Sequence, residues 1–175
     1  SDEIRKLELP TRDPLVWWLP IVRGITSNKI VAGMRNLGVD LWLYADDLDV
    51  AVPTHDRHPD RDGSYVIGFR RKIKADEENK NKSANELKKW GHKGITLPER
   101  LFLEAGFFVA TGRHLDVSSD TLCAGSRDSD GNVPVVFWGS GSRKVYVHWC
   151  GPDSSHGVLR SRSAVSLPAK VAIGD

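Results

Sequence analysis

The chain contains 175 residues, of which 39% are hydrophobic and 27% are charged, and its formal net charge is +2 at pH 7. A chain of this length is expected to form one domain over residues 1–175, and burial of roughly 70% of its unfolded surface would make a disulfide unnecessary. The small net charge does not favour nucleic acid as a partner. No apolar run is long enough for a transmembrane span, and the charged start (SDEIRKLELP) does not resemble a signal peptide.

Two elements are expected near the N-terminus. Residues 15–22 (LVWWLPIV) are rich in aromatic and β-branched residues and predict a short strand, preceded by a flexible or tethering segment over residues 1–14. Thr26 or Ser27 can cap a helix over residues 28–37. Its predicted apolar stripe consists of Ile30, Val31, Met34 and Leu37.

The next stretch predicts a second helix and a polar turn. Residues 40–52 (DLWLYADDLDVAV) carry apolar residues at helical spacing, at Leu41, Trp42, Ala45 and Leu48. Residues 55–63 (HDRHPDRDG) contain three aspartates and invite comparison with a calcium loop. An EF-hand would need an acidic residue where His58 stands and a bidentate carboxylate where Phe69 stands, so the match fails. We expect a solvated turn and no metal.

The middle of the chain predicts a strand, a loop and a well-marked helix. Residues 64–73 (SYVIGFRRKI) read as a strand, and the mixed charges of residues 74–89 predict an exposed loop with one helical turn at residues 83–89. Residues 96–99 (TLPE) form a capping box with proline in the first turn, and Gly112 marks the end of the helix. Its predicted stripe is Leu101, Phe102, Ala105, Phe108 and Val109.

The C-terminal region predicts a hairpin whose two faces differ. In residues 144–150, alternation places Val145, Val147 and Trp149 on one face, opposite Tyr146, His148 and Cys150. In residues 133–138 it places Pro134, Val136 and Trp138 opposite Val135 and Phe137. Residues 139–142 (GSGS) can turn the chain, residues 151–157 read as a loop beside the mixed face, and residues 158–165 can return as a third strand.

The mixed face of this hairpin has two interpretations. Aromatic rings, an imidazole and a thiol interspersed with Ser and Gly suit contact with a partner better than a core. The other interpretation is an ordinary sandwich strand whose second face is covered by the same chain. Alternation leaves both open, although Trp138 and Trp149 are expected to be buried in the frame.

The residue pattern does not favour an enzyme. The six histidines have no metal spacing, and no Walker loop or dinucleotide fingerprint is present, so no cofactor is expected. A thiol nucleophile at Cys150 with His148 or His156 is conceivable, but no orienting acid is recognisable. Cys123 and Cys150 could be bridged or free.

Several segments resemble the target proteins of diversity-generating retroelements, which occur in metagenomic bacteria, archaea and their viruses. The resemblance rests on framework pieces in residues 123–127 (CAGSR), 133–138 (VPVVFW), 145–149 (VYVHW), 152–153 (PD) and 159–165 (LRSRSAV). Upstream pieces, at residues 44–48 (YADDL), 62–65 (DGSY), 75–79 (ADEEN) and 95–101, are also similar.

The resemblance implies an α+β fold of the C-type lectin kind, as in formylglycine-generating enzymes, with two main helices flanking small antiparallel sheets. It implies a variable ligand-binding region over residues 121–167, whose partner is a protein or other macromolecule. Adenine mutagenesis of asparagine codons excludes Trp, Lys, Glu, Gln and Met from variable positions. The residues so assigned are Asp128, Asp130, Asn132, Val135, Phe137, Gly139, Tyr146, His148, Cys150, Gly151, Ser154, Ser155, His156, Gly157 and Val158.

The chain departs from related proteins of that fold in two respects. The calcium-binding motifs of sugar-binding lectins, Glu-Pro-Asn and Trp-Asn-Asp, are absent, so the resemblance does not imply calcium-dependent sugar binding. The oxidising cysteine pair of formylglycine-generating enzymes has no recognisable counterpart. The alternatives are a formylglycine-generating or other thiol-dependent enzyme, or a structural module of a viral or surface assembly.

Overall fold

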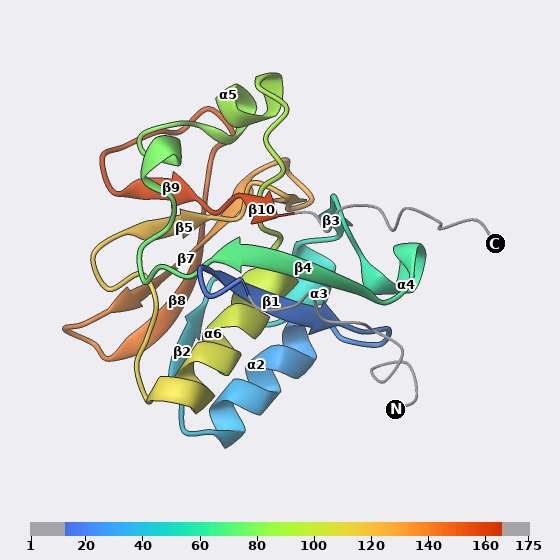
Figure 1. The fold of residues 1–175 in the computed structure, drawn as a ribbon, viewed down its shortest axis with the longest axis vertical. Coiled ribbons are helices and arrows are strands. Elements are labelled where there is room, and N and C mark those ends of the chain that lie inside the picture. The colour runs from blue at the N-terminus through green and yellow to red at the C-terminus, as the bar shows by residue number, and fades with distance from the viewer. Residues whose placement is uncertain (1–12, 166–175) are drawn as a thin grey trace.

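The computed structural model describes residues 13–165, which form an α+β arrangement of small sheets and helices (Figure 1). One sheet is antiparallel and has the order β1 (Val16–Ile21), β4 (Tyr65–Arg70), β10 (Ala164–Val165). The second has the order β2 (Leu41–Leu43), β8 (Lys144–Cys150), β7 (Val133–Gly139), β5 (Asp120–Leu122), β9 (Leu159–Ser161). The third pairs β3 (Thr54–His55) with β6 (Ser126–Arg127).

The helices are α2 (Ser27–Asn36), α3 (Leu48–Ala51), α4 (Pro59–Asp62), α5 (Ala84–Lys89) and α6 (Leu97–Thr111), with a 3₁₀ turn at Glu77–Asn79.

Helices α2 and α6 lie side by side and begin at the caps that the sequence predicts (Figure 1). The Thr96 side chain accepts the backbone N–H of Glu99, and the Glu99 carboxylate accepts that of Thr96 at 2.9 Å, which confirms the capping box. Gly112 ends α6 in the left-handed conformation, with φ of 66°. The stripes are shorter than predicted, because Leu37 and Val109 are 48% and 67% exposed at the ends of their helices.

The main core lies between the two helices and one side of the five-stranded sheet. Met34 of α2 and Leu101 of α6 are fully buried, as are Val136, Val145 and Val147 of the hairpin. This confirms the predicted inward face of β7 and β8. Trp149 was expected on the same face, but it is 45% exposed and lies outside this core. Alternation sets the side of the sheet on which Trp149 lies, but the core does not extend as far as the end of β8.

The prediction of a helix over residues 40–52 is wrong in its first half. Leu41, Trp42 and Leu43 form strand β2, which pairs in parallel with Val145, Tyr146 and Val147 of β8. Ladder hydrogen bonds to a strand more than a hundred residues away therefore override the helical spacing. Only α3 is helical, and the Asp47 carboxylate caps it by accepting the backbone N–H of Val50 at 3.0 Å.

The segment over residues 74–89 packs against the sheet instead of forming an exposed loop. Ala84 and Leu87 of α5 are 1% exposed and join a second core with Val133, Val135 and Leu159. Asn79 and Asp76 are buried because they satisfy backbone groups near β9 and β10, including the carbonyl of Ser161 and the N–H of Ser163. The predicted helical turn at residues 83–89 is confirmed by α5 and its Ser83–Glu86 capping box.

The last described residues form two strands in different sheets, not one third strand beside the hairpin. Strand β9 pairs in parallel with β5, and β10 pairs antiparallel with β4. Arg162, between them, turns its guanidinium into the protein and donates to the backbone carbonyls of Lys72 and Ile73. Residues 159–165 thereby join the two larger sheets. Residues 166 and 167 of the predicted variable region, and residues 1–12 of the predicted N-terminal segment, lie outside the described residues.

A buried ionic network connects α6 to the C-terminal strands. Asp116 lies between two guanidinium groups, with its oxygens 2.9 Å from nitrogens of Arg100 and of Arg162. Arg100 also pairs with Glu104 one turn along the helix, at 2.8 Å. All four side chains are at most 2% exposed. Such a group stabilises only as a complete set, because each lost partner leaves a charge buried without compensation.

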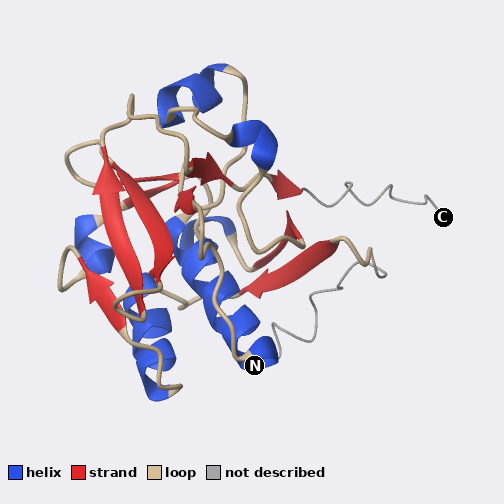
Figure 2. Cartoon of the chain, turned by 90° about the vertical axis from the view of Figure 1, so that its left-hand side faces the viewer, coloured by secondary structure: helices blue, strands red, loops and turns tan. Residues whose placement is uncertain are grey.

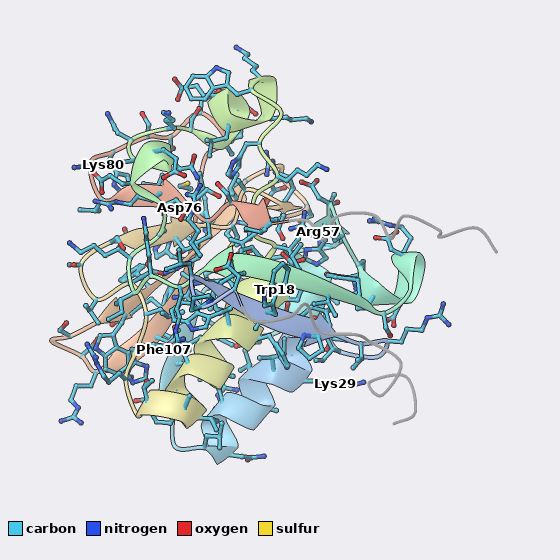
Figure 3. All side chains as sticks on the ribbon, in the orientation of Figure 1. Trp18, Lys29, Arg57, Asp76, Lys80 and Phe107 are labelled. Atoms are coloured by element: carbon cyan, nitrogen blue, oxygen red, sulfur yellow. The ribbon has the colours of Figure 1, made fainter. Side chains whose placement is uncertain are left out.

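A second buried carboxylate attaches the segment after β3 to the same helix. Both oxygens of Glu99 accept from Arg57 at 2.8 Å, and the hydroxyl of Tyr65 donates to one of them at 2.9 Å. Figure 3 shows Arg57 close to β4, the strand that carries Tyr65. Glu99 therefore both caps α6 and fixes the position of the neighbouring sheet.

His55 gives the fold a stability that depends on pH. It is 8% exposed, and burial together with neighbouring His58 lowers its pKa from 6.5 to about 4. Its Nδ1 lies 2.7 Å from the Ser126 hydroxyl, which already accepts the backbone N–H of Leu97 and can donate its proton only to an unprotonated imidazole. As the pH is lowered, His55 of the unfolded chain takes up a proton near pH 6.5, whereas His55 of the folded chain stays neutral until about pH 4. The free energy of unfolding therefore decreases as the pH falls from 6.5 to about 4.

We expect the His55 contribution to the free energy of unfolding to fall by about 2 kcal/mol between pH 7.5 and pH 5. Urea unfolding of the wild type and of His55→Gln at both pH values measures this contribution. Each protein gives a change in the free energy of unfolding between the two pH values, and the difference between these two changes isolates His55 from the other titrating groups. Equal pH dependence in the two proteins would contradict the prediction.

Candidate functional site

One end of the five-stranded sheet carries a row of stacked aromatic side chains on the side away from the main core. We call Trp42, Phe137, Tyr146 and His148 the aromatic face. The rings of Phe137 and Tyr146 are nearly parallel, with centroids 5.2 Å apart. Trp42 lies 5.7 Å from Tyr146 and 5.5 Å from His148. Neighbouring strands therefore place four rings in contact with one another.

The aromatic face is open because α5 covers only the other part of this side of the sheet. Helix α5 lies at one end of the molecule, above β9, and α2 and α6 lie toward the opposite end (Figure 1 and Figure 2). Toward β9, the side chains of Val133 and Val135 pack under Ala84 and Leu87. Toward β2, His148 is exposed, Trp42 is 41% exposed, and Phe137 and Tyr146 are half-buried. The same chain therefore covers one part of the mixed face and leaves the other part exposed.

The predicted variable positions differ widely in exposure. Those exposed are Asp130, His148, Ser155, His156, Gly157 and Val158. Those half-buried are Asn132, Phe137, Gly139, Tyr146, Cys150, Gly151 and Ser154. Asp128 and Val135 are buried, at 9% and 5% exposure, so these two are not available on a contact surface.

Asp128 is buried because it builds a turn. One of its carboxylate oxygens accepts the backbone N–H groups of Asp130 and Asn132 at 2.9 and 2.8 Å. Its own backbone N–H donates to the carbonyl of Asn132. This is the local bonding for which Asp is favoured in turns, and few other side chains could replace it.

Gly139 is coupled to the aromatic face by close approach. A Cβ at this position would lie 2.6 Å from the Tyr146 ring, so any other residue would have to displace that ring. The Tyr146 hydroxyl donates to Ser142 in the turn of the hairpin at 2.9 Å. A side chain at position 139 is therefore compatible only with a smaller or displaced side chain at position 146.

The loop over residues 151–157 is attached to α5. The backbone N–H of Asn85 donates to the carbonyl of Pro152 at 3.0 Å, and its side-chain amide donates to the Asp153 carboxylate at 2.7 Å. The exposed residues Ser155 and His156 consequently lie on the α5 side of the sheet. The loop supplies a second exposed area, next to the covered part of the sheet.

Within the described residues, the Cys150 thiol makes no hydrogen bond to His148 or His156. Both Cys123 and Cys150 are free thiols. Burial raises the pKa of Cys150, which favours the protonated thiol at neutral pH. The Nδ1 atom of His148 accepts the backbone N–H of Trp149 at 2.8 Å, so that nitrogen is already occupied. Within residues 13–165, no three His, Cys, Asp or Glu side chains are grouped to hold a metal ion.

Sequence reasoning missed one aromatic residue of this site, Trp42, which was placed on the stripe of a helix. In the structure Trp42 is on an edge strand, and its ring centroid lies 5.7 Å from that of Tyr146. The alternation of Leu41 and Leu43 around Trp42 was the available signal, since it places the two leucines on one side and the ring on the other.

No protein-family model, curated protein or solved structure matches this chain. None of the helices within residues 13–165 combines the length and the apolar character needed to cross a membrane.

Proposed function

We propose that this chain is a ligand-binding protein of the C-type lectin kind, diversified by a retroelement, and that its aromatic face binds a protein or another macromolecule. The observation that carries the proposal is the open row of four contacting rings on a sheet whose opposite side is the main core. Large, partly polar rings held by strands supply contact area at low entropic cost.

The division between the two sides of β8 supports tolerance to sequence change. Val145 and Val147 are completely buried, whereas His148 is exposed and Tyr146 half-buried on the opposite side. Residues on the open side contribute little to stability, because they make few contacts with the core. A scaffold of this kind can accept new side chains at its contact surface without unfolding.

The double substitution Tyr146→Ser with His148→Ser is expected to lower the free energy of unfolding by about 1 kcal/mol or less. The matched control on the same strand is Val147→Ser, which removes buried methyl groups and buries a hydroxyl, and which should cost at least about 2 kcal/mol. Denaturant unfolding of the three proteins gives both values. A large loss in the double variant would show that the aromatic face is part of the core.

Binding itself can be tested with a displayed library. Positions 137, 146 and 148 are randomised together, and the library is selected against several unrelated proteins. We expect specific binders to be recovered whose thermal unfolding resembles that of the parent chain. Recovery of no binders from a well-folded library would contradict the proposal.

The genetic part of the proposal has a separate test. The gene should lie near a reverse transcriptase and an imperfect copy of its own 3′ end, and the two copies should differ mainly at adenines. A locus with neither feature would contradict diversification by a retroelement. The binding experiment would still test whether the aromatic face is a contact surface.

A further inference from the structure

A small cavity lies apart from the aromatic face, between α5 and the β3–β6 ribbon. Its volume is about 150 Å³. We call it the Arg127 cavity, and its polar walls are the side chains of Asp56, Lys88, His92 and Arg127. Ala84 and Leu87 of α5 line it with apolar surface. The space suits a small polar group, because its lining includes two cationic side chains, Lys88 from α5 and Arg127 from β6.

Arg127 is a half-buried arginine without a carboxylate partner. Its Nη1 atom donates to the backbone carbonyls of Ala124 and Ser126 at 2.9 and 2.7 Å. Its Nε and Nη2 atoms donate to no residue within 13–165, and no carboxylate of that range lies within ion-pair distance of it. By contrast, each of the other arginines that are largely withdrawn from water has an acidic partner, namely Arg57, Arg100, Arg160 and Arg162.

The charges around the cavity leave this guanidinium under-compensated. Burial lowers the pKa of Arg127, and the nearby Asp56 opposes that shift without reversing it. Lys88 adds a second cation and forms no ion pair with the described residues. His92 is not a third cation at pH 7, since burial lowers its pKa, and its Nε2 lies 3.1 Å from the Ser161 hydroxyl.

We propose that the Arg127 cavity binds an oxyanion group, a carboxylate or a phosphate, through the unused N–H groups of Arg127 and the ammonium of Lys88. A planar guanidinium with two free N–H directions matches the two oxygens of such a group, and a half-buried site strengthens the pairing relative to one in water. The site does not depend on ligand binding by the aromatic face, and it takes no residue from that face.

The proposal is tested by titrating the ¹⁵N-labelled chain with sodium phosphate and, separately, with sodium acetate at constant ionic strength and pH 7. We expect saturable shifts of the backbone amide signals of Lys88, Gly125 and Arg127 with at least one anion. Saturation with acetate alone identifies a carboxylate site, saturation with phosphate alone a phosphate site, and saturation with both a general oxyanion site. No saturable shift at these amides with either anion would overturn the proposal.

Two substitutions should move the affinity in opposite directions. Arg127→Gln is expected to weaken binding at least tenfold, whereas Asp56→Asn should strengthen it several-fold by removing the competing carboxylate. The matched control is Arg35→Gln, an exposed arginine of α2 outside the cavity, which should leave the affinity unchanged. If Arg127→Gln does not fold, the gain in Asp56→Asn still decides the question. An unchanged affinity in Asp56→Asn, or in a folded Arg127→Gln, would overturn the assignment.

Discussion

Replacement of Asp116 by Asn is expected to lower the free energy of unfolding by about 3–5 kcal/mol, because it leaves two buried guanidinium groups without their shared anion. One Asp116 oxygen accepts from Arg162 and from the backbone N–H of Ala75, and the other accepts from Arg100 and the Thr121 hydroxyl. Burial raises the pKa of this carboxyl, but Arg162 and Arg100 outweigh it, so its pKa lies below the ordinary value. The folded protein therefore depends on the charged form.

Asn is the sharpest substitution at this position because it keeps the size of the side chain while it removes the charge and replaces one accepting oxygen by a donating amide. The backbone of Asp116 has φ of 52°, a left-handed conformation that Asn and Asp adopt more readily than other side chains. The matched control is Asp130→Asn at an exposed turn position, which should change stability by less than about 0.5 kcal/mol. Urea unfolding measures both. A loss below about 1 kcal/mol for Asp116→Asn would mean that the network adds little to stability.

Replacement of Phe69 by Ala should lower the free energy of unfolding by about 3–5 kcal/mol, as expected for a fully buried aromatic side chain. Phe69 is 0% exposed at the centre of its sheet, where it pairs with Trp17 of β1 and Ala164 of β10. Phe69 belongs to the main core, so the cavity left behind would lie in that core, on one face of β4. We expect the full cost, because the close-packed residues around the cavity can relax into it only in part.

Trp149→Ala is the matched comparison, since it truncates an aromatic residue that is 45% exposed. We expect it to cost about 1 kcal/mol or less, because much of the ring is already in water. Thermal and denaturant unfolding of the two variants give the ratio directly. Equal losses would show that Trp149 belongs to the frame, as its alternation in β8 first predicted.

The sequence predicted those parts of the fold whose signals are local. The capping box at Thr96 and Glu99 is a relation between residues three apart, and the alternation of Val145 and Val147 is a relation between residues two apart. Both are visible without knowledge of the partner. The corresponding helix and the inward face of the hairpin are therefore confirmed.

The parts that failed depend on residues distant along the chain. The local spacing of residues 41–43 fits a helix as well as a strand, and the ladder hydrogen bonds to β8 decide for the strand. The ionic network joins Arg100, Asp116 and Arg162, and in a one-dimensional sequence these are three ordinary surface charges. These charges become a buried, mutually paired group only in the folded chain, which brings them together away from water.

The candidate site was predicted in outline for the same reason. Alternation placed Phe137, Tyr146 and His148 on one side of the hairpin, which the structure shows. It gave no indication that α5 would cover Val135 on that side, or that Asp128 would turn its carboxylate inward to its own backbone. How far a covering helix extends depends on packing, which a single strand does not encode.

Strand β2 pairs with β8 from outside the C-terminal region, so Trp42 is encoded roughly a hundred residues before Tyr146 and His148, whose rings it contacts. If residues 121–167 are rewritten from one copy of the gene to the next, each new surface would still inherit the same indole at its edge. All variants of this chain would then share the indole of Trp42 as a constant contact residue, and their ligands would be limited to those that can accept an aromatic ring at that edge.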